Sequence, residues 1–193
     1  MRKFDGAAAT AIIGAAPSLL PETMPALTAR VTLRRIQAED VPMILAMEAD
    51  PAVMQHSTGV KPATEARHQE LLTWLQEPRT ELGHWTVLAD DLAVGWISLV
   101  PLGEDGRIQI AYRFCRAAWG QGYATQAGRQ LCGYVWRTLD VPELVAVVWP
   151  DNHASKRVLE KLGFAFRVLE PHYGRQTAVY VLPRPAGQSA LSS

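Results

Sequence analysis

The hydrophobic and polar positions along the chain predict an ordered series of strands and helices. Short runs rich in β-branched and aromatic residues predict strands, and apolar residues recurring every three or four positions predict helices. The predicted strands are Arg30–Ile36, His84–Ala89, Leu92–Pro101, Arg107–Cys115, Glu143–Trp149, Phe166–Glu170 and Thr177–Leu182. The predicted helices are Val41–Ala49, Glu65–Gln76, His153–Leu162 and a long one within Trp119–Leu139.

The connections between these elements predict a mixed sheet. Short turns separate the three strands between His84 and Cys115, which favours an antiparallel meander. The run Glu143–Trp149 is almost continuously apolar, as in a strand covered on both faces. Because it follows a strand and a crossover helix, we expect it to lie parallel to Arg107–Cys115.

Single residues refine the ends of these elements. Asp40 is expected to cap the helix that follows it, and Pro51 to stop that helix. Gly95 inside a strand predicts a bulge or a close approach of backbones. Gly163 is placed as a helix C-cap, and Pro171–Gly174 is expected to form a loop.

The two ends of the chain differ in composition from its middle. We expect residues 1–28 to form a poorly ordered extension, residues 29–183 the domain, and residues 184–193 a flexible tail. Met24 is an alternative start, because the folded pattern begins just after it. A secretory signal cleaved near Ala16 is the competing hypothesis for the extension.

Composition limits the classes of partner. The chain has 193 residues, of which 48% are hydrophobic, and its 19 basic residues balance its 19 acidic ones. This neutral balance gives no reason to expect nucleic acid or a membrane as a partner. Cys115 and Cys132 lack the spacing of a zinc site, so we expect no metal. Two buried free thiols in a reducing cytoplasm fit them better.

A glycine turn precedes the longest predicted helix. Gly120 and Gly122 lie between a strand and that helix, where backbone N–H groups and the helix dipole favour an anion such as phosphate. Glycines would let such a ligand approach the backbone closely. An ordinary tight turn before a core helix explains these two glycines equally well.

A second segment makes the pattern specific. The motif WGQGYAT follows a strand, and NHASKRVLEKLGF follows about thirty residues later. This ordered pair resembles the GCN5-related N-acetyltransferase (GNAT) superfamily, and most closely its branch of ribosomal-protein N-terminal acetyltransferases. The resemblance spans roughly Val31 to Leu182. It implies the acyl-CoA N-acyltransferase fold, in which a mixed α+β, mostly antiparallel sheet is splayed at one parallel pair, with helices on both faces.

The resemblance also implies the residues that bind acetyl-CoA. In the family, the glycine turn and the helix N-terminus hold the pyrophosphate, and the end of the preceding strand pairs with the pantetheine arm. The implied pyrophosphate residues are Gly120, Gln121, Gly122, Tyr123, Ala124 and Thr125. The implied pantetheine residues are Phe114, Cys115 and Arg116, while Asn152 and Ser155 would lie near the thioester.

Plainer interpretations exist for several of these residues. Asn152 or His153 would serve equally as a helix cap, and Ser155 could do the same. We expect Trp119 to be a core anchor beneath the turn. The basic residues of the second motif would either attract the ribose phosphate of the cofactor or form a solvated helix face. They are Lys156, Arg157 and Lys161.

The chain departs from the family at catalytic positions. Gln109 stands where many relatives have a glutamate base, and Leu159 where many have a tyrosine acid. Ser155 is therefore a candidate general acid, and the base is unknown. Its candidates are His56, Glu104 and a chain of waters. His56 and Tyr112 are further candidates for the acceptor pocket.

The predicted function is transfer of an acetyl group from acetyl-CoA to a primary amine by direct attack. The acceptor is a protein or peptide α-amine, or a small-molecule amine such as an amino acid, polyamine or aminoglycoside. The alternative is a catalytically silent acyl-CoA-binding sensor or scaffold module. A nucleotide site ranks last, because the GK[ST] lysine of a triphosphate loop is missing. The expected assembly is a monomer or a homodimer.

Overall fold

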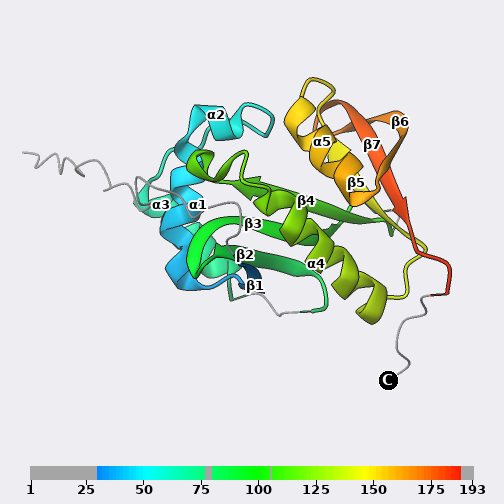
Figure 1. The fold of residues 1–193 in the computed structure, drawn as a ribbon. Coiled ribbons are helices and arrows are strands. Elements are labelled where there is room, and N and C mark those ends of the chain that lie inside the picture. The colour runs from blue at the N-terminus through cyan, green and yellow to red at the C-terminus, as the bar shows by residue number, and fades with distance from the viewer. Residues whose placement is uncertain (1–29, 77–79, 105, 188–193) are drawn as a thin grey trace, which may run out of the picture.

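A single seven-stranded sheet forms the centre of the computed structural model, which describes residues 30–76, 80–104 and 106–187 (Figure 1). Its strands are β1 (Val31–Arg35), β2 (Gly83–Ala89), β3 (Leu92–Pro101), β4 (Ile108–Phe114), β5 (Glu143–Val148), β6 (Ala165–His172) and β7 (Arg175–Pro183). Their order across the sheet is β1-β2-β3-β4-β5-β7-β6.

The sheet is splayed at its one parallel pair. Every other pair of neighbours is antiparallel, whereas β4 and β5 run parallel and are joined in register only at Gln109 and Val145. Helix α4 (Tyr123–Thr138) makes the crossover between these two strands. The predicted parallel pairing and antiparallel meander are therefore confirmed.

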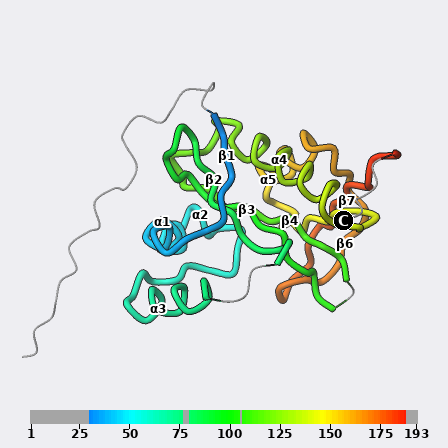
Figure 2. Tube along the Cα trace, turned by 90° about the horizontal axis from the view of Figure 1, so that it is seen from below, coloured from blue at the N-terminus to red at the C-terminus, as the bar shows by residue number. Residues whose placement is uncertain are grey.

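Helices cover both faces of the sheet, as predicted. The α-helices besides α4 are α1 (Val41–Ala49), α2 (Pro51–Met54), α3 (Glu65–Trp74) and α5 (His153–Leu162), and the short 3-10 helices are η1 (Ala38–Asp40) and η2 (Arg116–Ala118). On β3, Ile97 packs in the cluster that contains α4, and its neighbour Trp96 packs against the cluster of α1 and α3. Successive side chains of a strand point to opposite faces. Figure 2 shows α1 and α3 on one side of the sheet and α4 and α5 on the other.

Helices α4 and α5 pack closely against each other. Ala127, Leu131 and Val135 of α4 are at most 1% exposed and face the sheet. At Gly128, a Cβ atom would lie 2.5 Å from Leu162 Cδ1 of α5. The two helices therefore approach closely at Gly128, where a larger residue would displace the Leu162 side chain, and both of their N-termini face the carboxyl ends of β4 and β5 (Figure 1).

Gly95 has both of the properties expected of it. Val87 pairs with Gly95 and Leu88 pairs with Ala93, which leaves Val94 as the extra residue of a bulge. A Cβ on Gly95 would lie 2.4 Å from the Arg113 carbonyl oxygen, so β3 and β4 approach closely here.

Two details of the prediction are wrong, and the predicted ends of two helices are confirmed. The Asp40 carboxylate does not cap α1 but accepts hydrogen bonds from Arg34 and Thr86, because a buried carboxylate needs strong donors. Pro171 continues β6, so the expected loop shrinks to the turn between β6 and β7. Gly163 caps α5 in the left-handed conformation, and α1 ends before Pro51, which begins α2.

Both cysteines are buried free thiols, as expected. Burial raises the pKa of Cys115 to about 11 and that of Cys132 to about 12, so both stay protonated at neutral pH. No helix within the described ranges is long and apolar enough to cross a membrane. Among the same residues, no cluster of His, Cys, Asp and Glu is arranged to hold a metal ion.

The division of the chain at its two ends stays a prediction. The expected extension, Met24 included, and residues 188–193 of the expected tail lie outside the described residues. Arg184, the first residue of that tail, is held against the body of the protein: its backbone N–H donates to the Pro142 carbonyl, and its guanidinium lies 5.4 Å from the centre of the Trp136 ring.

Candidate active site

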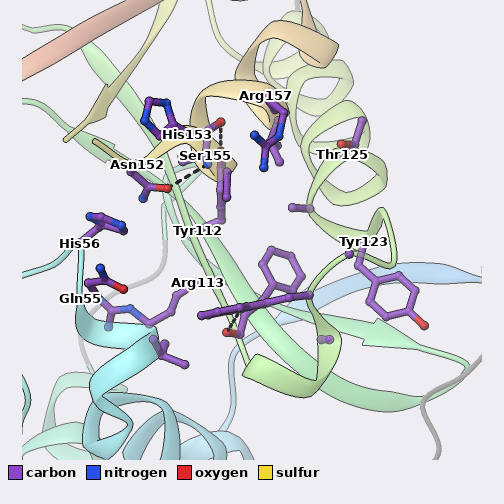
Figure 3. A pocket seen from close by; sticks show the side chains of 18 of the residues that line it. Gln55, His56, Tyr112, Arg113, Tyr123, Thr125, Asn152, His153, Ser155 and Arg157 are labelled. Atoms are coloured by element: carbon purple, nitrogen blue, oxygen red, sulfur yellow. Dashed lines mark hydrogen bonds between the residues drawn. The ribbon is translucent and has the colours of Figure 1, made fainter. Parts of the chain in front are cut away.

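An open pocket of about 610 Å³ lies at the carboxyl ends of β4 and β5 (Figure 3). It is lined by α2 and the residues after it, the end of β4, the turn before α4, and the first turns of α4 and α5. Of the predicted site residues, the lining includes His56, Tyr112, Phe114, Gly120, Gly122, Tyr123, Ala124, Thr125, Asn152 and Ser155. The fold thus brings together residues from four separate stretches of the sequence.

The glycine turn opens into this pocket. Gly120 and Gly122 both have φ of 77°, a left-handed conformation that favours glycine. A Cβ atom on either glycine would meet no other atom within 4 Å, so both face open space. Gly122 is the N-cap of α4, and the N–H groups of the first helical turn, such as those of Ala124 and Thr125, have no intrahelical acceptor. The turn therefore offers backbone donors and the positive end of a helix dipole to an anion.

Tyr123 contributes to this turn through its backbone. Its side chain is 1% exposed and belongs to the main hydrophobic core. In Figure 3 its ring points away from the pocket that its backbone lines. The aromatic ring anchors the first turn of α4 and so fixes the direction of the N–H groups beside it.

Trp119, near the end of β4, does not lie where it was expected. Instead of lying in the core, Trp119 is 48% exposed and lines the pocket. Its indole Nε1 donates to the Phe114 carbonyl oxygen at 3.0 Å, which holds the side chain at the strand end rather than in the core. The indole thus forms part of the pocket wall beside the backbone of Phe114.

Three predicted residues do not line the pocket. Cys115 packs into the core of α1 and α3, and its N–H donates to the Val94 carbonyl. Arg116 points to α2, where its guanidinium pairs with Asp50 at 3.0 Å. Gln121 lies in the turn between the two glycines, also outside the lining.

The N-terminus of α5 and the end of β4 each supply one hydroxyl group, from Ser155 and Tyr112. Asn152 Oδ1 accepts a hydrogen bond from the Ser155 N–H at 3.0 Å, so Asn152 caps this helix. Ser155 Oγ lies 2.8 Å from the Tyr112 hydroxyl, and that hydroxyl also donates to the Ser155 carbonyl at 3.2 Å. Burial raises the pKa of Tyr112 to about 12, so the pair keeps its protons at neutral pH. Two linked O–H groups therefore border the pocket (Figure 3).

The basic residues of α5 divide into two groups. Arg157 and Lys161 line the pocket and add positive charge to it, and Figure 3 shows Arg157 on the side of Thr125. Lys156 instead donates from Nζ to the Pro150 carbonyl at 2.5 Å and lies outside the lining.

The opposite end of the pocket is formed by residues that follow α2. His56 stands edge-on to the Trp149 ring, and its Nδ1 lies 3.6 Å from Asp151 Oδ1. Arg113, a residue of β4, donates from Nη2 to Ser57 Oγ at 2.5 Å. The sequence analysis did not single out Arg113, because an arginine in a strand has no motif and its partner lies 56 residues away.

The departures from the family pattern have structural explanations. Gln109 is buried at the splay, where its Oε1 accepts a hydrogen bond from the Tyr173 hydroxyl at 2.8 Å. Leu159 is 1% exposed in the main core, so no side chain from that position reaches the pocket. Glu104 lies exposed in the turn after β3, outside the pocket lining.

The pocket is suited to a ligand with phosphates at one end. Backbone donors gather at the glycine turn, and the protonated hydroxyl pair borders the same cavity. The opening in front of Gly120 and Gly122 is one that a side chain would partly fill. These features fit the pyrophosphate and arm of a coenzyme A ester.

Comparison with known proteins agrees with this description. Residues 30–165, more than half of the chain, match the family model described as an acetyltransferase (GNAT) domain. The uncharacterized protein YkkB of Bacillus subtilis is 29% identical over 160 residues, which cover 79% of this chain and 92% of that protein. FsC-acetyl coenzyme A-N(2)-transacetylase of Aspergillus fumigatus is 28% identical over 70% of this chain and 63% of its own length.

Solved structures share the fold. An acetyltransferase of the GNAT family from Bacillus anthracis has a TM-score of 0.68 at 20% identity, covering 80% of this chain and 95% of its own. The aminoglycoside acetyltransferase AAC(6′)-Ib, in complex with coenzyme A and kanamycin, has a TM-score of 0.68 at 16% identity, with the same coverage of both chains.

The family match, the splayed sheet and the glycine turn at the mouth of the pocket lead to one assignment. The chain belongs to the acetyltransferase (GNAT) family and is an enzyme that uses acetyl-CoA as its acetyl donor.

Proposed function

We propose that the enzyme transfers the acetyl group to a primary amine by direct attack of the amine on the thioester. The observation that supports this most is the left-handed glycine turn before α4, which opens into the same pocket as the Tyr112–Ser155 hydroxyl pair. The acceptor is a protein or peptide α-amine, as in the ribosomal-protein branch that the motifs resemble, or a small-molecule amine. The family match favours this enzyme over a catalytically silent acyl-CoA-binding module.

The binding roles follow from the site. The turn from Gly120 to Thr125 holds the pyrophosphate, and Arg157 and Lys161 add positive charge beside it. The backbone at Phe114 and the Asn152–Ser155 segment line the path toward the thioester. Bound acetyl-CoA supplies an activated acyl group. The enzyme supplies chiefly the positioning of the amine against it, which is worth at most about 7–11 kcal/mol of the barrier.

The hydroxyl pair is the proposed proton source for the departing sulfur. Ser155 donates its proton to the departing sulfur while the Tyr112 hydroxyl, protonated at neutral pH and 2.8 Å away, donates to Ser155 Oγ, and the pair regains its lost proton from solvent after coenzyme A leaves. The group that accepts the amine's proton is not assigned. Of the two side chains considered, His56 lines the pocket and Glu104 does not.

A thiol-release assay tests the proposed function. The full-length chain is mixed with acetyl-CoA and a panel of amines that includes peptides with free N-termini, amino acids, polyamines and aminoglycosides. We expect release of free coenzyme A that depends on at least one amine, with an acetylated product of matching mass. Tight binding of coenzyme A without turnover on any amine would exclude the transfer reaction.

The cellular compartment and the assembly state of the enzyme are also part of the proposal. Two buried free cysteines are typical of a reducing compartment, which supports a cytoplasmic location. The proposed assembly is a monomer or a homodimer, which sedimentation equilibrium distinguishes.

A further inference from the structure

The guanidinium of Arg113 is a partly enclosed cation with few partners. Arg113 lies opposite Trp96 across β3 and β4, and its Cζ is 5.2 Å from the centre of the indole ring. Its one side-chain hydrogen bond within the described residues is the 2.5 Å bond to Ser57 Oγ. Since a guanidinium has five N–H donors, most of them lack a protein acceptor there.

Glu48, the acidic group whose charge acts on Arg113, is engaged with another cation. Glu48 accepts two hydrogen bonds from Arg67, at 2.8 and 2.9 Å. In the described part of the chain, no ion pair within 4.0 Å joins Arg113 to a carboxylate, and Glu48 pairs with Arg67 instead. Burial lowers the pKa of Arg113 although Glu48 raises it, as expected for a cation that is short of negative charge. A cation withdrawn from water whose nearby carboxylate is already hydrogen-bonded to another cation favours an incoming anion.

The position of Arg113 separates it from the phosphate-binding end. Figure 3 shows its side chain extending toward Gln55 and His56, whereas Thr125 lies on the far side of the pocket, on α4. In the proposed function, the glycine turn and Arg157 serve the phosphates at that far end. An anion held by Arg113 therefore belongs to the second substrate.

We propose that Arg113 binds a carboxylate of the acceptor, which makes the acceptor a small amine of the amino-acid type with a free carboxylate. This inference deepens the proposed function and rests on it. A planar guanidinium matches a carboxylate with two parallel hydrogen bonds, and Ser57 fixes its orientation. The Gln55 amide lies at the same end of the pocket and offers a further donor. An acceptor with several positive charges, such as an aminoglycoside, would bring like charge against Arg113.

Matched pairs of acceptors test this inference. Thiol release from acetyl-CoA is measured with amino acids and with their α-amides, which differ only in the carboxylate. We expect kcat/KM to be at least tenfold higher for the acid than for the amide. The amine of the amide is the more readily deprotonated of the two, so an intrinsic difference in amine reactivity would act against the expected preference.

Three variants assign any preference to Arg113. Arg113→Gln is expected to bring the acid-to-amide ratio close to one, and Arg113→Lys to keep part of the preference because it keeps the charge. Arg129→Gln is the matched control, since Arg129 lies exposed on α4 outside the pocket lining, and it should leave the ratio unchanged. The KM for acetyl-CoA and the melting temperature show whether each variant is folded.

Each result has a distinct meaning. Equal turnover of acids and amides, or a preference that survives in Arg113→Gln, overturns the carboxylate site and leaves the transfer reaction standing. If no amine is turned over, calorimetric titration of the amino acids and amides into protein saturated with coenzyme A still decides the inference. Binding of the acid but not of the amide, lost in Arg113→Gln, supports it, and absence of binding refutes it.

Discussion

The two ends of the pocket are built in different ways. The phosphate-binding end is made by the backbone of consecutive residues, from Gly120 to Thr125, and takes its charge from the start of one helix. The acceptor end is made by side chains of separate elements, with Arg113 from β4 meeting Ser57 after α2. Any chain that forms this turn presents the same backbone N–H groups, whereas the side chains at the acceptor end can be substituted individually. The first end is therefore suited to a constant cofactor and the second to a particular acceptor.

The largest predicted effect is a loss of stability at acid pH, caused by a buried histidine in the packing that supports the acceptor end. His84 lies edge-on to Trp74 and Trp96, with ring centres 4.7 and 5.7 Å away. Burial, assisted by Arg35, lowers the pKa of His84 to about 4. In the unfolded chain the His84 imidazole takes up a proton below about pH 6.5, whereas in the folded protein it does so only near pH 4. Stability present above pH 6.5 is therefore lost as the pH falls to 4, by roughly 3 kcal/mol.

Urea unfolding at a series of pH values measures this loss. His84→Gln should remove most of the difference in unfolding free energy between pH 6.5 and pH 4. Glu48, whose pKa is lowered, adds its own loss of stability at acid pH, and that part should remain in the variant. A slope in His84→Gln as steep as in the unchanged protein would contradict the assignment.

The next effect concerns the phosphate-binding end. Gly122→Val forces a β-branched residue into a left-handed conformation and places its side chain in front of the helix N-terminus. We expect coenzyme A to bind about a hundredfold more weakly, as measured by calorimetric titration. Gly103→Val is the matched control, because Gly103 also has a positive φ and open space around it, in a turn outside the pocket lining. Equal loss of affinity in both variants would mean that strain alone is responsible.

A smaller effect is expected where the two ends meet. Ser155→Ala and Tyr112→Phe should each lower kcat about tenfold and leave the KM for acetyl-CoA within about twofold. Because the two hydroxyls share one hydrogen bond, the double variant should be little worse than the poorer single variant. Losses that multiply in the double variant would show that the two hydroxyls act independently.

The smallest effect is expected at the turn between β6 and β7. Tyr173→Phe removes the hydroxyl that donates to Gln109 but keeps the ring. We expect a rise of about two- to fivefold in the KM for the amine and no change in the KM for acetyl-CoA. Tyr134→Phe is the matched control, since it also loses one hydrogen bond, but to the Glu81 carbonyl and not to Gln109 at the splay. An equal change in both variants would argue against a specific effect of the Tyr173–Gln109 hydrogen bond on amine binding.

Much of the fold could be predicted because its signals are local. The bounds of α1, α5 and β3 agree with the hydrophobic pattern, and the one parallel pair follows from the crossover by α4. The errors lie where distant residues compete for a side chain. Asp40 serves Arg34 and Thr86 instead of α1, and Trp119 bonds to the end of β4 instead of entering the core.

By itself, the sequence determined the order of strands and helices and the turn at Gly120 and Gly122, because each depends on residues close together along the chain. Only the tertiary structure decided which side chains meet across the pocket. Ser57 lies 56 residues from Arg113, Tyr112 lies 43 from Ser155, and Gln109 lies 64 from Tyr173. Those contacts depend on strand register and helix packing, which shift whole sets of side chains together and leave no short motif.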